Sequence, residues 1–163
     1  MIGYVKQILV GQYEASLAML NQCIEACPPE QWESIIAQGT FRWVVYHTLF
    51  YCDLYLSPNN EAFELRDLHE RGGHELGPGA TLGLSREDDL TYLAICRQKA
   101  HESLAAETEE SLAGPSGFDW YQNTRGEMHM INIRHIQHHT GQLAERIRQA
   151  TGLGVGWVGG SRR

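Results

Sequence analysis

Three histidines lie close together near the C-terminal end of the chain. They are His135, His138 and His139, within the segment RHIQHHTGQL. At about 100° per residue in a helix, His135 and His139 stand on one face a single turn apart, near enough to hold one metal ion. His138 is rotated by about 60° to the other side of His135 and would flank such a site. Two imidazoles alone make a poor metal site, so the functional prediction depends on a third ligand.

The third candidate ligand is His47, which lies midway through the apolar segment Phe41–Leu56. A buried imidazole without a partner costs about 1–3 kcal/mol, so His47 should bond a carbonyl, a carboxylate or a metal. Taken alone, His47 is better explained as a hydrogen-bonded core histidine. However, His135 and His139 also border the apolar face of their own helix, and three histidines from two helices can converge inside a bundle. Three neutral imidazoles leave coordination positions open, as catalytic zinc sites require.

Four long helical patterns account for most of the chain. Apolar residues recur every three or four positions in three of them, and the second is apolar almost all round. The patterns are separated or ended by Pro28-Pro29, by Ser57-Pro58-Asn59-Asn60 or by glycine-rich stretches. The segments are Ile2–Ala26, Phe41–Leu56, about 85–111, and about 124 to a stop at Gly152. With no convincing strand, the pattern predicts an all-α four-helix bundle.

The 28-residue connection at 57–84 is long enough to cross the bundle and let the second and third helices run parallel. We expect a short helix in it at about 61–68, and we expect His69 and His74 to be in solvent. Segments 71–75 and 118–121 are candidates for the walls of a pocket. The bundle is predicted to form one domain, residues 1–152, followed by a glycine-rich tail, residues 153–163, which Trp157 would hold to the body.

Composition excludes several classes of function. The chain has 163 residues, 42% of them hydrophobic, which suits a single domain. A net charge of -7 argues against binding nucleic acid. No basic leader and no apolar run of roughly 18 residues is present, so we predict a soluble cytoplasmic protein without a membrane partner. The cysteines form no Cys-x-x-Cys pair and are expected to be buried thiols; they are Cys23, Cys27, Cys52 and Cys96.

Three of these features together resemble the DinB/YfiT-like superfamily, over nearly the whole chain. They are the Pro-Pro-Glu-Gln-Trp motif after the first helix, the histidine in an aromatic-rich second helix, and the C-terminal His-x-x-His-His-x-Gly-Gln. The resemblance implies an up-down-down-up four-helix bundle, commonly a homodimer, with a divalent metal ion, often nickel or zinc. By position, the ligands would be His47, His135 and His139, and His138 would be a non-ligand histidine. Thr140 stands where family members often have arginine, so a charge-based role of that arginine is absent or moved.

Characterised members of that family include metal-dependent transferases and an isomerase that use small thiols such as bacillithiol, mycothiol or glutathione. A divalent ion with three neutral ligands keeps its full charge and favours deprotonation of a bound thiol or water. The sequence therefore favours a thiol-dependent S-transferase or a hydrolase acting on a small electrophilic molecule, and the ligands do not separate the two. The alternative is a non-enzymatic dimeric stress or binding module in which the metal is structural.

Candidates for proton transfer depend on the third and fourth helices packing as neighbours. Each of these candidates is better explained as a solvated helical residue. They are His138, Glu127, His101 and Arg97.

Overall fold

The structure is a computed structural model of the chain and describes residues 1–36, 39–69, 74–75, 77 and 83–160. Most of these residues are helical. Four long helices form the body: α1 (Ile2–Ala26), α3 (Phe41–Leu56), α4 (Arg86–Ala106) and α6 (Arg125–Thr151). The all-α prediction is therefore confirmed, and α1 and α3 have the predicted bounds.

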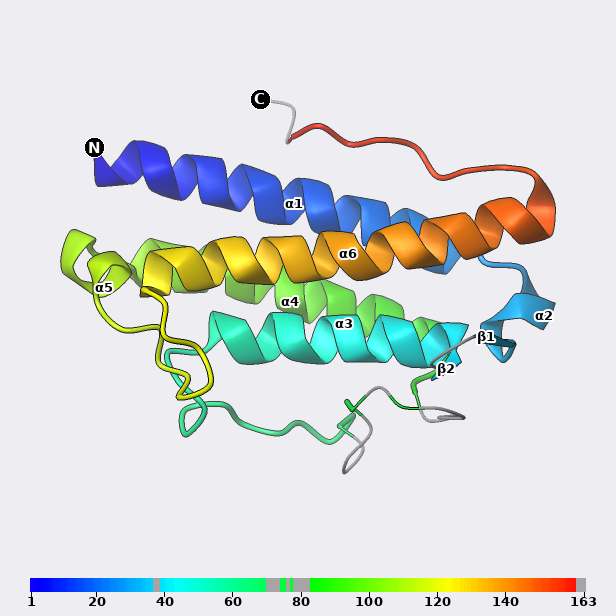
Figure 1. Cartoon of the computed structure of the whole chain (residues 1–163), viewed down its shortest axis with the longest axis horizontal. Helices are drawn as coiled ribbons and strands as arrows, with labels where there is room; N and C mark the ends of the chain where they lie inside the picture. The colour runs from blue at the N-terminus through cyan, green and yellow to red at the C-terminus, as the bar shows by residue number, and fades with distance from the viewer. Residues whose placement is uncertain (37–38, 70–73, 76, 78–82, 161–163) are drawn as a thin grey trace.

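The four long helices run along a common direction (Figure 1). Helices α1 and α6 point one way, and α3 and α4 point the other way. Both α1 and α3 pack against α4 and against α6, so α4 and α6 occupy opposite corners. The condition that the sequence sets for the proton-transfer candidates, that the third and fourth long helices pack as neighbours, is therefore not met. The neighbours of α6 are α1 and α3.

Helix ends follow the capping chemistry of the sequence. The Ser85 hydroxyl accepts a hydrogen bond from the Asp88 backbone N–H at the start of α4. Thr124 and Glu127 form a reciprocal capping box at the start of α6. Gly152 ends α6 in the left-handed region, with φ of 73°.

Short elements between α1 and α3 were not predicted. Helix α2 (Pro29–Trp32) is followed by two antiparallel strands, β1 (Ile35–Ile36) and β2 (Gly39–Thr40). Thr40 is also the N-cap of α3, since its hydroxyl accepts from the Trp43 backbone N–H at 3.3 Å. This small hairpin therefore leads directly into the helix that carries His47.

The predicted helix at 85–111 is broken in two. Helix α4 ends at Ala106, and α5 (Glu109–Ala113) follows it. Between them, the Glu107 carboxylate accepts hydrogen bonds from Arg125 at 2.8 Å and His129 at 3.1 Å, both on α6. These bonds to a distant helix accompany the break at Glu107 and tie it to the start of α6.

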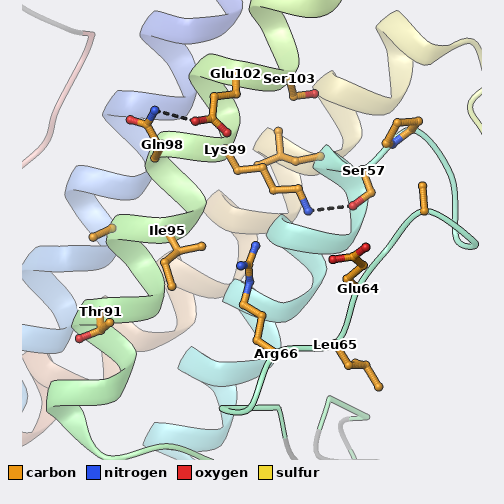
Figure 2. Close-up of a pocket in the computed structure, with 14 residues that line it drawn as sticks. Ser57, Glu64, Leu65, Arg66, Thr91, Ile95, Gln98, Lys99, Glu102 and Ser103 are labelled. Atoms are coloured by element: carbon orange, nitrogen blue, oxygen red, sulfur yellow. Dashed lines mark hydrogen bonds between the residues drawn. The ribbon is translucent and has the colours of Figure 1, made fainter.

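The connection after α3 contains turns and no helix at 61–68, so that expectation is wrong. The buried Asp53 carboxylate of α3 anchors it. Lys99 of α4 lies 2.5 Å from one carboxylate oxygen and Arg66 of the connection lies 3.2 Å from the other. Both cations point into a cavity of about 770 Å³ between α4 and the connection (Figure 2). Because the Asp53 carboxylate binds both cations, we infer that Asp53, Lys99 and Arg66 together hold the connection against the bundle.

His69 and His74 are not in solvent, contrary to the sequence-based expectation. The His69 side chain is buried and donates to the Tyr92 hydroxyl at 2.7 Å, which donates to Asp53. The His74 ring is partly buried and stacks on Phe50, with ring centroids 4.2 Å apart. Both errors have one cause, because each partner lies more than 20 residues away from its histidine in sequence, on a helix that flanks the connection.

The tail is held differently from the prediction. The Gly156 backbone N–H donates to the Gln22 side-chain oxygen at 2.7 Å, and Val155 packs on the core. Trp157, the predicted anchor, is 80% exposed.

The four cysteines are free and buried, as predicted. Burial raises the pKa of the Cys23 thiol to about 12. No helix in the part of the chain that the structure describes is long and apolar enough to cross a membrane.

Candidate metal centre

Helices α3 and α6 pack side by side and bring the three candidate ligands together. His47, His135 and His139 each offer one ring nitrogen, and these nitrogens all lie within 4.8 Å of one another. The Nε2 atoms of His47 and His135 are 3.2 Å apart. The sequence-based expectation that these three side chains converge therefore agrees with the geometry.

The tautomer of His47 is set by the connection after α3. Its Nδ1–H donates to the backbone carbonyl of His74 at 2.5 Å, and a carbonyl can only accept. The Nε2 of neutral His47 therefore carries a lone pair, which faces His135.

The tautomer of His139 is set by Gln142, one turn further along α6. The His139 Nδ1–H donates to the Gln142 side-chain oxygen at 2.8 Å, which leaves Nε2 as the lone-pair nitrogen. The same amide donates from its NH₂ group to His138 Nε2 at 3.2 Å. His138 itself is exposed. His138 therefore contacts the amide that accepts from His139 and offers no nitrogen to the three-histidine cluster.

His135 differs from the other two histidines. Its Nδ1 atom is buried and has no hydrogen-bond partner among the described residues. If its proton is on Nε2, the buried Nδ1 lone pair is unsatisfied; if it is on Nδ1, two lone pairs face each other across 3.2 Å. A cation between the Nε2 atoms of His47 and His135 removes that repulsion.

Burial keeps the three imidazoles neutral. Desolvation lowers the pKa of His47 to about 4 and that of His135 to about 3, with the neighbouring imidazoles lowering the His135 value further. Desolvation also lowers the pKa of His139, although the bond to Gln142 opposes it. Neutral imidazole is the form that binds metal ions.

These residues fit a divalent metal ion. Two nitrogens that each lie about 2.0–2.1 Å from a tetrahedral zinc ion are separated by about 3.3 Å, close to the observed distance between His47 and His135. Two of the three ligands also donate their second N–H to an acceptor, which is usual for metal-binding histidines. The cluster could therefore hold an ion.

An apolar cavity of about 720 Å³ adjoins the centre. We call it the aromatic cavity. Of the two predicted wall segments, 118–121 contributes Trp120 and 71–75 contributes His74; residues 71–73 lie outside the described residues. The aromatic cavity is lined by His47, Phe50, Tyr51, Leu54, Tyr55, Asn60, Phe63, Leu65, His74, Trp120 and His135.

The loop that carries Trp120 approaches the connection so closely at one position that only glycine fits there. Gly117 has φ of 88° and lies against Pro58, so a Cβ atom at this position would be 2.0 Å from the Pro58 carbonyl oxygen. A side chain cannot be accommodated there without moving the loop.

A second, more polar hollow of about 800 Å³ runs along α6. We call it the α6 groove. Its lining includes Glu127, Arg134, His138 and His135. His135 therefore lines both the aromatic cavity and the α6 groove.

The other candidates for proton transfer have partners elsewhere. The Glu127 carboxylate bonds Thr124 in the capping box, and these bonds lower its pKa. Arg97 and His101 on α4 both bind Glu14 of α1, at 3.1 and 2.9 Å. The structure therefore does not bring Glu127, Arg97 or His101 to the histidine nitrogens.

Sequence reasoning missed two groups that orient the ligands. Gln142 lies one turn from His139 on α6, so its i,i+3 spacing could have identified it. The His74 carbonyl could not be found in this way, because it depends on the path of the connection.

Comparison with known families gives a match over most of the chain. The DinB superfamily matches residues 12–143, a range that includes all three histidines of the centre. Comparison with curated proteins and with solved structures found no match. Because the match extends over well more than half of its residues, the chain belongs to the DinB superfamily.

Proposed function

We propose that this protein is a divalent-metal-dependent enzyme, either a thiol-dependent S-transferase or a hydrolase, that acts on a small electrophilic molecule. One observation carries the proposal: His47, His135 and His139 converge, with tautomers that aim two lone pairs into the cluster. Nickel or zinc is the proposed ion, with all three histidines as ligands. The ion would supply a Lewis acid that lowers the pKa of a thiol or of water.

The chain's own residues would position the reactants. The His74 carbonyl and Gln142 orient two of the ligands, and the aromatic cavity gives a molecule access to His47 and His135. We further propose that the four long helices form an up-down-down-up bundle and that the protein is a cytoplasmic homodimer. The free, buried thiols support a reducing compartment.

Elemental analysis of protein purified without a histidine tag tests the metal centre. We expect about one nickel or zinc ion per chain, and the loss of that ion in His135→Ala. His101→Ala is the matched control, because His101 lies on α4 and is bound to Glu14. Unchanged metal content in His135→Ala would refute the three-histidine assignment.

A second candidate function is a non-enzymatic binding module with a structural metal. It is favoured by one observation: three of the four candidates for proton transfer are bound elsewhere, namely Glu127, His101 and Arg97. The two functions are separated by turnover of an electrophile with and without an added thiol. Unfolding on metal removal, with no turnover in any condition, would support the module and refute the enzyme.

A further inference from the structure

Among the residues that the structure describes, the lining of the aromatic cavity is uncharged and mostly aromatic or apolar. No carboxylate, ammonium or guanidinium group lines it within the described part of the chain. Its tyrosines are neutral phenols, and burial, followed by the Glu75 carboxylate, raises the pKa of Tyr51. In the metal-free protein, a charged ligand would lose its hydration here without gaining an ion pair from the described lining residues. The described lining therefore favours an uncharged ligand.

The rings that line the aromatic cavity meet at several angles, from the stacked pair of Phe50 and His74 to edge-to-face contacts. Phe50 meets Phe63 with ring centroids 5.3 Å apart and an interplanar angle of 77°. On the α3 side, Tyr51 and Tyr55 are 5.4 Å apart. Walls of this kind offer both faces and edges of rings, which suits a flat apolar ligand.

Two exposed apolar side chains line this same cavity from different segments. Leu65 of the connection is 71% exposed, and Trp120 of the loop before α6 is 52% exposed. Single exposed apolar residues are common, but two that share a cavity next to a candidate metal centre are informative. A ligand in the cavity would shield both from water.

The aromatic cavity and the metal centre share two side chains, His47 and His135. A molecule that fills the cavity therefore touches the centre. A volume of about 720 Å³ lies within the range of small-molecule sites, about 300–1,000 Å³.

We propose that the aromatic cavity binds the uncharged aromatic body of the substrate and places its reactive group beside His47 and His135. The proposal rests on the proposed function for its metal-dependent chemistry. Binding of the aromatic body itself depends only on the cavity lining.

A pair of fluorescent probes tests the selection against charge. Phenyl-naphthylamine is neutral, and anilinonaphthalene sulfonate has the same aromatic body with one added negative charge. We expect the metal-free protein to bind the neutral probe at least about tenfold more tightly, a difference of about 1.4 kcal/mol. Equal affinity for the two probes, or tighter binding of the sulfonate, would overturn the proposal.

Two matched pairs of variants locate the probe. Trp120→Ala and Leu65→Lys should each weaken binding of the neutral probe by about tenfold. The control for the first is Trp157→Ala, because Trp157 is 80% exposed on the tail; the control for the second is Leu153→Lys, because Leu153 is 72% exposed. Both controls should bind as the unmodified protein does. Equal losses in a variant and its control would place the probe outside the aromatic cavity.

Loading the protein with Cu²⁺ or Zn²⁺ tests whether the bound probe lies close to the metal centre. Cu²⁺ held by the three histidines should quench the bound probe, Zn²⁺ should not, and His135→Ala should abolish the quenching. If the ions bind but Cu²⁺ does not quench the probe, the proposed aromatic site beside the centre is refuted, while the metal centre is retained. If no ion binds, the proposed metal-dependent function is refuted. Binding of the aromatic body in the cavity is then still tested by the two probes and the variants.

Discussion

At the residue scale, the three histidines of the centre are not equivalent. His47 is held by a backbone carbonyl, His139 by the Gln142 side chain, and His135 has a buried nitrogen without a partner in the described chain. Substitution can therefore remove the support of His139 without touching a ligand.

We expect Gln142→Ala to weaken metal binding by about 10–100-fold, because His139 loses the acceptor that fixes its ring. Equilibrium dialysis against nickel or zinc measures the change. Gln142→Glu keeps an acceptor and should restore most of the affinity. The control is Gln149→Ala on the same helix, because Gln149 is exposed and bonds only Glu145 among the contacts identified. Equal affinity in Gln142→Ala and the unmodified protein would refute the orienting role.

The residue scale is also where the sequence was most informative. Helical spacing places His135 and His139 on one face, and a polar ring within the apolar helix Phe41–Leu56 needs a partner, so their convergence could be predicted. The burial of His69 could not be predicted, because its partner Tyr92 lies beyond the long connection.

At the element scale, the connection after α3 depends on one buried carboxylate. Asp53 binds Lys99 from α4 and Arg66 from the connection, and it accepts a hydrogen bond from Tyr92. The connection in turn supplies the carbonyl that orients His47. The anchoring of the connection and the geometry of the centre are therefore coupled.

We expect Asp53→Asn to reduce the free energy of unfolding by about 3–5 kcal/mol, because two cations lose their buried counter-charge. Urea unfolding measures the change. Glu145→Gln is the control, since its pair with Arg148 is exposed and should contribute little. A loss below about 1 kcal/mol in Asp53→Asn would contradict the anchoring role.

Elements bounded by local signals could be predicted, and elements bounded by distant contacts could not. Pro28 and the cap at Ser85 are local, and the nearby helix ends were placed within a residue or two. The break after Ala106 involves Glu107 bonded to Arg125 and His129, which a scan along the sequence cannot pair.

At the scale of the whole molecule, several histidines are buried in the neutral form. Desolvation lowers the pKa of His129 and of His47 to about 4, and that of His135 to about 3. In the unfolded chain a histidine titrates near 6.5. Below that pH the histidines of the unfolded chain bind protons, whereas the buried histidines of the native protein stay neutral. Acid therefore favours unfolding.

We therefore expect the metal-free protein to be most stable above pH 6.5 and to lose stability as the pH falls toward about 4. Each such histidine should contribute a slope of up to about 1.4 kcal/mol per pH unit. Urea unfolding at a series of pH values measures the total. In His129→Gln the slope of unfolding free energy against pH should be smaller by the contribution of one histidine. A stability that does not change between pH 7 and 5 would contradict the prediction.

The exposed face near the start of α1 is a candidate contact surface for the proposed homodimer. Tyr4, Val5 and Ile8 are exposed apolar residues near its start. If the proposed homodimer uses this face, sedimentation should report a dimer, and Ile8→Glu should convert it to a monomer, because a charge replaces an apolar contact. Leu153→Glu on the tail is the control and should remain dimeric. An unmodified protein that sediments as a monomer would refute the dimer.

His135 forms part of the wall of both the aromatic cavity and the α6 groove. Molecules bound in the two hollows would both contact this imidazole, and each would influence the affinity of the other to the extent that it shifts the ring. Whatever factor the occupant of the groove imposes on binding in the cavity, the occupant of the cavity imposes on binding in the groove. The sum of the two binding free energies is then the same for either order of addition. The side chain of His135 would be the group through which binding of one reactant changes binding of the other.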